Sequence, residues 1–423
     1  MNEYKVKPYR PNGKILEVRV PASKSILNRA LLLSAFSKGI VHLTCGALSE
    51  DTRAFLDCLH ALEIVAEQTD HGITVHGCDG SVPVRNAVLN VKSAGTAARF
   101  LTVALAFAGG DYTLTSSEQM KRRPMDVLAL LEEAGVNITY LEEKGHFPFR
   151  LHSDGIVAEE LTVDTDRSTQ YASGILLAAG MRDTPLRLCL TGSRTNGSYI
   201  NITKNMLRAF HTPYAEHENV LTVFPSEQPP QQYTVEPDVS GACYFYALAL
   251  LHRTRVLVHG VHSDSTQGDM KFLSLLAEKG VVFTEQAEGL LADGSNVKDF
   301  TGFDVDMSDF SDQTLTTAAL APFATSPSVL RNVSHIRLQE CDRIAAIIEN
   351  LAAIGVPAST DGNDIYITPA PITGGTIDPH GDHRVAMAFS LVGLKTGNIA
   401  VSDPDCCKKT FENFFELLEK ITR

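Results

Sequence analysis

The feature that most constrains the fold is a pattern that occurs six times, at intervals of about seventy residues. Each copy begins with small polar residues and continues as an apolar run of helical length, which is typical of the start of a buried helix. The six copies are Ser23–Phe36, Ser93–Phe107, Arg167–Ala179, Val239–Leu251, Ser311–Ala321 and Gly381–Leu391. The pattern predicts an α/β chain that is built from six similar units.

A second helix and several strands follow each buried segment. The second helix is amphipathic, with apolar residues at i, i+3, i+4 and i+7, as in Arg123–Gly135, Met270–Gly280 and Cys341–Gly355. Short alternating strands come next. Examples are Ile73–His76, Phe147–Arg150, Val220–Val223 and Ile365–Thr368. We therefore expect one enclosed helix and one outward-facing helix in every unit.

The six units divide into two sets of three. A chain of 423 residues is too long for one ordinary core. Pro225–Tyr233 is rich in proline and glutamine and lies between the third and fourth units, so it is the preferred boundary. We expect one domain of residues 21–233 and a second of residues 234–423 with residues 1–20. The first twenty residues would supply a strand to the second domain. The chain would then pass between the domains twice, once after these residues and once near residues 225–238.

Composition narrows the class of protein. A hydrophobic content of 44% and a charged content of 21% are those of a globular protein. The eight cysteines lack the spacing of a disulfide framework or a zinc site, and no signal peptide is recognisable, so we expect reduced thiols in the cytoplasm. The net charge of −13 argues against nucleic-acid and membrane partners. Any anion site must therefore be a local concentration of basic residues.

Basic residues stand at the starts of several buried helices. Lys24 and Arg29 begin the first, where Ser23 or Ser25 can serve as the cap. Cations oppose the positive end of a helix dipole, so this placement indicates an anionic ligand; the alternative is a capped helix with solvated basic residues. The fourth start, Val239–Cys243, has no cation and is interpreted as structural. The other starts contain Gly95, Thr96 and Arg99; Arg167, Ser168, Thr169 and Gln170; Asp312; and Asp382, His383 and Arg384.

The amphipathic helices repeat this arrangement. Basic residues at their starts are Arg122, Arg123, Arg343, Lys408 and Lys409. One such residue usually belongs to a solvated face, but the recurrence at equivalent positions favours binding of phosphates and carboxylates. Two acids lie among them, Asp312 and Glu340, and each is a candidate base or acid. Asp312 has the alternative role of an N-cap. His380 and His383 are interpreted as structural or hydrogen-bonding rather than metal-binding.

Five motifs, in this order along the chain, carry a resemblance to a known family. They are Ala22–Arg29, Ala94–Arg99, Arg123–Pro124, Glu340–Arg343 and Asp382–Arg384. Together they resemble the 5-enolpyruvylshikimate-3-phosphate (EPSP) synthases, over essentially the whole chain. The resemblance implies a two-domain inside-out α/β barrel, with six βαβαββ-type units arranged three per domain around a pseudo-threefold axis.

The resemblance also implies the reaction. Its members, 3-phosphoshikimate 1-carboxyvinyltransferases of the shikimate pathway, transfer the enolpyruvyl group of phosphoenolpyruvate to the 5-hydroxyl of shikimate 3-phosphate and release phosphate. The chemistry proceeds by addition and elimination through a tetrahedral intermediate. It needs neither a metal nor an organic cofactor, and we expect a monomer whose partners are these two small molecules.

Site residues follow from the same resemblance. The residues implied around phosphoenolpyruvate are Lys24, Gly95, Arg123, Gln170, Arg343, Arg384 and Lys409. Those implied for shikimate 3-phosphate are Ser25, Arg29, Ser168, Thr169, Gln170, Tyr199, Asp312 and Gln339. Asp312 would be the base at the 5-hydroxyl and Glu340 the acid and base at the methylene carbon. Lys24 would assist proton transfer to the departing phosphate.

The sequence departs from the family pattern mainly at the residues expected to bind shikimate 3-phosphate. Gln339 stands where the family usually has lysine, His335 where asparagine is common, Asn196 where serine is usual, and Ser93 where asparagine is frequent. Loss of a cation contact to a phosphate costs about 1.5–3 kcal/mol. Acceptor affinity and acceptor identity are therefore less strongly implied than the reaction type.

Three alternatives remain. A sister transferase acting on UDP-N-acetylglucosamine would have Lys-Asn in place of Lys24-Ser25, and a cysteine in the loop Ser117–Pro124, which has none. A second alternative keeps the chemistry but uses another acceptor. A third is a non-catalytic anion-binding paralogue, against which Asp312 and Glu340 argue. The inhibitor glyphosate gives no clear expectation, because Gly95 leaves room beside the pocket while Phe100 replaces a frequent proline.

Overall fold

The computed structural model describes residues 3–166 and 168–423, and Arg167 lies outside the described residues. The chain forms two compact units. Unit 1 comprises Met1–Pro21 with Pro237–Arg423, and unit 2 comprises Ala22–Glu236. Each unit has its own core of buried apolar side chains. None of the helices in the described ranges combines the length and the apolar character that crossing a bilayer requires.

Unit 2 contains three four-stranded sheets among its described residues. The first consists of β14 (Gln232–Thr234), β3 (Ile40–Thr44), β5 (Gly72–His76) and β4 (Ala66–Thr69). The second consists of β6 (Asn86–Asn90), β7 (Gly110–Thr115), β9 (Phe149–Ser153) and β8 (Asn137–Tyr140). The third consists of β10 (Glu160–Asp164), β11 (Leu186–Thr191), β13 (Val220–Val223) and β12 (Tyr214–His217). In each sheet the first two strands are parallel and the other pairs antiparallel.

Unit 1 also contains three sheets among its described residues. One sheet is formed by β16 (Val282–Gln286), β17 (Gly289–Asp293), β15 (Arg255–His259) and β2 (Leu16–Val18). The next is formed by β18 (Asp304–Asp306), β19 (Ser328–Arg331), β21 (Ile365–Ile367) and β20 (Ala358–Thr360). The last, three-stranded in the described part of the chain, is formed by β1 (Tyr4–Lys5), β23 (Ile399–Val401) and β22 (Gly375–Ile377).

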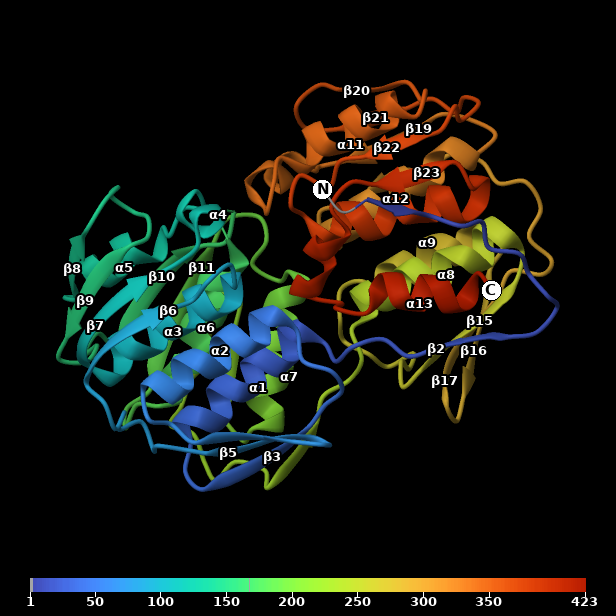
Figure 1. Cartoon of the computed structure of the whole chain (residues 1–423). Coiled ribbons are helices and arrows are strands. Elements are labelled where there is room, and N and C mark those ends of the chain that lie inside the picture. The colour runs from blue at the N-terminus through green and yellow to red at the C-terminus, as the bar shows by residue number, and fades with distance from the viewer. Residues whose placement is uncertain (1–2, 167) are drawn as a thin grey trace. The chain divides into compact units, whose positions relative to one another are not determined.

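The six predicted buried segments are helices that lie inside the sheets of their own unit (Figure 1). They are α1 (Lys24–Phe36), α3 (Gly95–Ala108), α6 (Thr169–Ala179), α8 (Val239–His252), α10 (Thr314–Leu320) and α12 (His383–Thr396). In α3 every residue from Gly95 to Phe107 is buried, which explains why its sequence is apolar on all faces. The predicted helix Ser311–Ala321 begins instead with a 3₁₀ turn, η1 (Ser311–Gln313).

An amphipathic helix follows each buried one, as predicted, but two starts differ: Arg122 and Arg123 precede α5, and Lys408 and Lys409 lie in η4 rather than at the start of α13. The amphipathic helices are α2 (Glu50–Ala61), α5 (Val127–Glu133), α7 (Ser198–Ala209), α9 (Met270–Glu278), α11 (Arg343–Ala353) and α13 (Phe414–Ile421). Short elements complete the list: α4 (Glu118–Lys121), η2 (Ala321–Phe323), η3 (Ser334–Leu338) and η4 (Pro404–Lys409). The order strand, helix, strand, helix, hairpin confirms the predicted βαβαββ unit in the first five units; in the described part of the sixth, β1 pairs with β23 and no hairpin follows α13. The strand expected at Phe147 begins at Phe149, because Pro148 has no N–H for the ladder.

Two strands are exchanged along the chain. The strand before α1 is β2, and it pairs in parallel with β15 of unit 1. The strand before α8 is β14, and it pairs in parallel with β3 of unit 2, so residues 234–236 belong to unit 2. Each of these two strands therefore belongs to one unit, while the helix that follows it in the sequence belongs to the other. The chain passes between the units directly before the helix starts at Lys24 and Val239.

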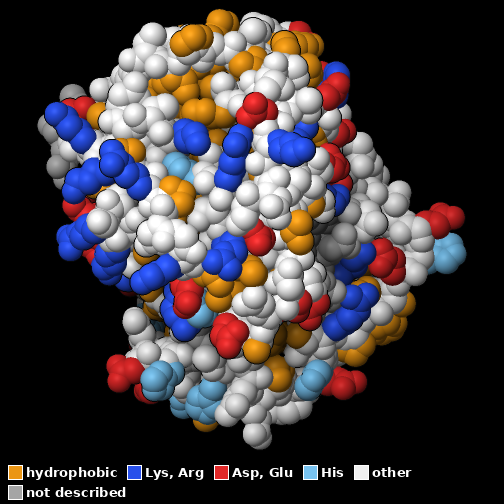
Figure 2. Space-filling model, turned by 90° about the vertical axis from the view of Figure 1, so that its right-hand side faces the viewer, with side chains coloured by type: hydrophobic (Ala, Val, Ile, Leu, Met, Phe, Trp, Pro, Cys, Tyr) orange, Lys and Arg blue, Asp and Glu red, His pale blue; other side chains and the backbone are white. Residues whose placement is uncertain are grey.

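The surface mixes charges of both signs. On the face shown in Figure 2, Lys and Arg side chains gather in one part and Asp and Glu side chains are interspersed among them and beside them. The net charge is −13. An anion site would therefore depend on the partly buried basic residues at the helix starts.

Candidate active site

The start of α1 carries Lys24, which pairs with an acid that the sequence did not point out. Lys24 Nζ lies 3.0 Å from Asp51 Oδ2. Asp51 belongs to the first turn of α2 and is buried. Ser23 occupies the cap position, but its side chain makes no capping hydrogen bond. A buried carboxylate beside the ammonium fixes the position of Lys24 at the helix start.

Arg29, one turn further along α1, is 1% exposed. Its guanidinium donates to Thr203 Oγ1 at 2.9 Å, Ser25 O at 2.7 Å, Ser173 Oγ at 3.2 Å and Tyr199 O at 3.3 Å. The ring centroid of Phe100 lies 5.1 Å from Arg29 Cζ, within cation–π range. Burial lowers the pKa of Arg29 to about 10. The charge is thus retained at neutral pH without a carboxylate among its described contacts.

The start of α3 brings two arginines close to a glycine. A Cβ on Gly95 would lie 2.9 Å from Arg99 Nη1 and 3.0 Å from Arg123 Nη1. Arg99 Nη1 donates to Gly95 O at 3.3 Å, and its Cζ lies 5.6 Å from the ring centroid of Tyr171. Thr96 Oγ1 accepts from Asn28 Nδ2 at 2.6 Å, which joins this start to α1. Gly95 therefore lets two guanidinium groups approach the backbone of a helix N-terminus.

The start of α6 places three polar side chains in a row. Ser168 is the N-cap, and its hydroxyl accepts from Gln170 N at 3.3 Å. Thr169 and Gln170 begin the helix and are half-buried. Gln170 Oε1 is buried and accepts no hydrogen bond from the described residues. Tyr199, in the first turn of α7, has its ring centroid 6.0 Å from Arg29 Cζ.

Two arginines and two aspartates of unit 1 form a continuous chain of ion pairs. Arg343, 2% exposed, lies with Nη1 2.8 Å from Asp312 Oδ1 and with Nε 2.8 Å from Asp382 Oδ2. Arg384 Nη2 lies 3.0 Å from Asp312 Oδ2. Burial acts to lower the pKa of Arg343, but the charges of Asp382 and Asp312 outweigh it and raise that pKa above its ordinary value. The helix starts of η1, α11 and α12 are joined by these contacts.

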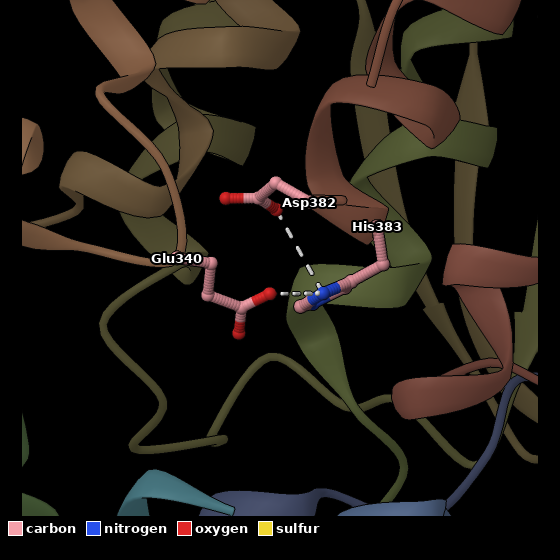
Figure 3. Close-up of side chains that lie close together, drawn as sticks. All are labelled: Glu340, Asp382 and His383. Atoms are coloured by element: carbon pink, nitrogen blue, oxygen red, sulfur yellow. Dashed lines mark hydrogen bonds and ion pairs between the residues drawn. The ribbon is translucent and has the colours of Figure 1, made fainter. Parts of the chain in front are cut away.

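Glu340 forms a second cluster, drawn in Figure 3 with two of its neighbours. Glu340 Oε1 lies 3.0 Å from Lys409 Nζ, and Glu340 Oε2 lies 3.0 Å from His383 Nδ1. His383 Nδ1 is also 3.7 Å from Asp382 Oδ1. Glu340 thus sits between a lysine from η4 and a histidine from α12, an arrangement that can deliver and accept a proton. The expectation that His383 is a hydrogen-bonding residue agrees with this contact.

The cluster of Glu340, Asp382 and His383 brings together one potential metal-ligand atom from each residue within 4.8 Å. Its oxygens already have other partners. Lys409 and His383 contact the two oxygens of Glu340; Arg343 Nε and the backbone N of Arg384 contact those of Asp382. Lys409 and Arg343 supply the positive charge that a cation would otherwise bring, so the cluster does not call for a metal.

The residues that depart from the family pattern lie in both units. Gln339 ends η3 and is half-buried, directly before Glu340. Asn196 Oδ1 accepts from Lys204 Nζ at 3.4 Å, and Lys204 also lies 3.0 Å from Glu216 Oε1. Ser93 Oγ and Ser117 Oγ share a hydrogen bond of 2.7 Å. The side chains of Asn196 and Ser93 are thus held by local partners.

The start of α8 contacts the ion-pair chain of unit 1 through Ser240, and the structural interpretation of Val239–Cys243 stays a prediction. Ser240 Oγ donates to the carboxylate of Asp269 and lies 3.5 Å from Arg384 Nη2. The sequence does not predict Asp269 and Asp51 as site residues, because acids at helix starts are common without any function. Both acids stand at such starts, before α9 and in α2, and that position was the signal.

Solved structures with the same fold are enolpyruvyl transferases. EPSP synthase from Acinetobacter baumannii matches with a TM-score of 0.80 and 24% identity, over 99% of this chain and 98% of that one. The enolpyruvyl transferase NikO from Streptomyces tendae matches with a TM-score of 0.75 and 16% identity, over 99% and 96%. At these identities the likeness concerns the fold.

Sequence comparison supplies the family. The EPSP synthase (3-phosphoshikimate 1-carboxyvinyltransferase) family model matches residues 12–418. The 3-phosphoshikimate 1-carboxyvinyltransferase of Nostoc sp. (strain PCC 7120) is 34% identical over 403 residues, which are 94% of each chain. The chain belongs to the EPSP synthase family, as its five motifs led us to expect.

Proposed function

We propose that this enzyme transfers the enolpyruvyl group of phosphoenolpyruvate to the 5-hydroxyl of shikimate 3-phosphate and releases inorganic phosphate. Membership of the family and the five motifs support the reaction. The observation that carries it furthest is that the two candidate proton-transfer acids, Asp312 and Glu340, are each ion-paired with a cation assigned to phosphoenolpyruvate.

The proposal assigns residues to each substrate from the family resemblance. Those for phosphoenolpyruvate are Lys24, Gly95, Arg123, Gln170, Arg343, Arg384 and Lys409. Those for shikimate 3-phosphate are Ser25, Arg29, Ser168, Thr169, Gln170, Tyr199, Asp312 and Gln339. Both substrates are polyanions, which gives the buried cations a chemical purpose.

The reaction requires two steps with opposite proton movements. In the first, the 5-hydroxyl oxygen bonds to C2 of phosphoenolpyruvate, its proton passes to Asp312, and Glu340 in its acid form protonates C3. In the second, the Glu340 carboxylate takes a proton back from the methyl group and the C2–O bond to phosphate breaks. Lys24 gives a proton to the departing phosphate, and exchange with solvent restores Asp312 and Lys24.

The ion pairs support this assignment because a substrate anion can replace a carboxylate. When a phosphate takes Lys409, Glu340 loses a contact at 3.0 Å that favours its ionised form, so it can become the acid that C3 needs. When a carboxylate or phosphate takes Arg384, Asp312 Oδ2 loses its ion pair and can accept the hydroxyl proton, while Oδ1 keeps its contact with Arg343. Substrate binding would thus switch both groups into their working states.

The test is release of phosphate from phosphoenolpyruvate in the presence of shikimate 3-phosphate. We expect acceptor-dependent turnover that Lys24→Met abolishes and that Lys38→Met, at an exposed lysine of the same unit, leaves unchanged. Absence of turnover above background would refute the proposal. Release with another hydroxyl acceptor but not with shikimate 3-phosphate would support the altered-acceptor alternative that Gln339 raises. The cytoplasmic location and the monomeric state remain predictions.

A further inference from the structure

Asp269 of unit 1 lies at the start of α9, much as Asp51 lies at the start of α2 in unit 2. Lys24 stands three residues after Pro21 at the start of α1, and Ser240 stands three residues after Pro237 at the start of α8. Each acid has a basic residue two positions later, Arg53 or Lys271. The two units therefore show similar pairs, each formed by a polar residue at one helix start and an acid at the start of the next helix.

The difference lies in how the buried acid is neutralised. In unit 2 the helix start supplies an ammonium, and Lys24 Nζ lies 3.0 Å from Asp51 Oδ2. In unit 1 the helix start supplies only the Ser240 hydroxyl, which donates to Asp269 Oδ2. Asp269 is 9% exposed. The cation beyond that hydroxyl is Arg384, whose Nη2 lies 3.5 Å from Ser240 Oγ and 3.0 Å from Asp312 Oδ2.

The ion-pair chain of unit 1 consequently carries a surplus of acid. Together with Asp269, the ion-pair chain contains three carboxylates and only two guanidinium groups, so its formal charge is −1. The carboxylates are those of Asp269, Asp312 and Asp382, and the guanidinium groups are those of Arg343 and Arg384. A proton on Asp269 would remove that surplus. An anionic ligand on Arg384 would increase it, which makes a proton on Asp269 more favourable still.

The surroundings of Asp269 allow it to take that proton near neutral pH. Burial and the charge of Asp312 raise the pKa of Asp269 to about 6, against the lowering effects of Arg384 and the Ser240 hydrogen bond. The charge of Asp238, the N-cap of α8, also raises the pKa of Asp269. From α8, Cys243 contacts the backbone oxygen of Asp269. These are the charged and titratable groups that face the carboxylate.

We propose that Asp269 is a positioning residue of the reaction, which orients Arg384 through Ser240 and takes up a proton from solvent when Arg384 exchanges Asp312 for the anionic group of phosphoenolpyruvate. The inference rests on the proposed function. It deepens that function by adding a pH-dependent control of phosphoenolpyruvate binding behind the residues that contact the substrate.

The experiment compares KM for phosphoenolpyruvate between pH 6 and pH 8 in the wild-type chain and in Asp269→Asn. Ionised Asp269 opposes an incoming anion, so the wild-type KM rises with pH more steeply than that of the variant, by up to about tenfold for a shift of one pKa unit. Asp299→Asn is the matched control, because Asp299 is an exposed acid of the same unit paired with Arg253. It keeps the wild-type profile.

A second variant tests the link through the hydroxyl. Ser240→Ala leaves Asp269 in place but removes the contact to Arg384, so KM for phosphoenolpyruvate rises while kcat and KM for shikimate 3-phosphate stay close to wild type. Two results would overturn the role of Asp269. One is that the active wild-type enzyme and Asp269→Asn show the same pH profile of KM for phosphoenolpyruvate; the other is that this KM is unchanged in Ser240→Ala. Absence of wild-type turnover at any pH would instead overturn the proposed function.

Discussion

Gly95→Ala separates the stability of α3 from its proposed role in anion binding. Gly95 is the first residue of α3, and its φ does not lie in the left-handed region. Alanine at such a position restricts the unfolded chain and favours the helix, which stabilises a protein by about 0.4–1 kcal/mol. At roughly 2–4 °C per kcal/mol for a domain of this size, we expect the melting temperature to rise by about 1–4 °C.

The same methyl group is expected to weaken the binding of phosphoenolpyruvate. It would lie 2.9 Å from Arg99 Nη1, 3.0 Å from Arg123 Nη1 and 3.4 Å from Arg123 Nη2. These atoms are the ends of long side chains, so they can move by a few tenths of an ångström without disturbing the core. If Arg123 thereby loses one charge-assisted hydrogen bond to phosphoenolpyruvate, the cost is about 1.5–3 kcal/mol. That corresponds to a rise in KM for phosphoenolpyruvate of about 10- to 100-fold.

Gly241→Ala is the matched control. Gly241 lies in the first turn of α8, where a Cβ would meet Phe411 at 3.6 Å and Asp238 Oδ2 at 3.8 Å, both ordinary contacts. We expect a similar gain in melting temperature with unchanged KM values. The assays are thermal unfolding and steady-state kinetics with each substrate varied in turn.

The outcome distinguishes a binding role for Arg123 from a structural one. An unchanged KM for phosphoenolpyruvate in Gly95→Ala would show that neither guanidinium beside Gly95 contacts that substrate. A large loss of melting temperature would show that the helix start cannot absorb a methyl group by moving the arginine ends. Either result would refute the reasoning from the two short distances.

Three further substitutions test the proton-transfer and acceptor assignments. Glu340→Gln should lower kcat by orders of magnitude, since its acid and base roles are lost while the amide fills the same space; KM for phosphoenolpyruvate should not rise, because the carboxylate that competes for Lys409 is gone, and near-normal kcat would remove Glu340 from the mechanism. Asp51→Asn should lower kcat/KM for phosphoenolpyruvate by about 10- to 100-fold, because Lys24 loses its ion pair; wild-type kinetics would make that pair merely structural. Gln339→Lys should lower KM for shikimate 3-phosphate by about tenfold or more, and an unchanged KM would show that this position does not contact the acceptor.

The fold could be predicted largely because its information is local and repeated. A buried helix such as α3 is apolar on every face, and an amphipathic helix such as α11 has a period near 3.6, so each type is recognisable within one unit. Six copies of the pattern then reinforce one another. What the local pattern could not supply was capping detail: Ser23 makes no capping hydrogen bond with its side chain, whereas Ser168 and Asp382 do.

The site was predicted less completely because its partners come from distant parts of the chain. Asp312, Arg343 and Arg384 stand at three different helix starts, and only the packing of η1, α11 and α12 makes them a chain of ion pairs. Acids in the first turn of a helix favour the dipole and are common without any function. Asp51 and Asp269 therefore look ordinary in the sequence, and only their burial beside Lys24 and Ser240 distinguishes them.

Arg29 of unit 2 and the cations Arg384 and Lys409 of unit 1 are stabilised in different ways, and the difference has a consequence for substrate binding. Arg29 of unit 2 is solvated by hydroxyl and carbonyl oxygens and by an aromatic ring, so an incoming carboxylate has no internal carboxylate to displace. Arg384 and Lys409 of unit 1 are paired with Asp312 and Glu340, so an anion must compete with both acids. Competition weakens binding, but in the proposed mechanism the displaced carboxylates are the groups that the chemistry needs. On that mechanism, Arg384 and Lys409 would convert part of the binding energy of phosphoenolpyruvate into the release of the acid and the base, whereas Arg29 would be a preorganised cation for the acceptor.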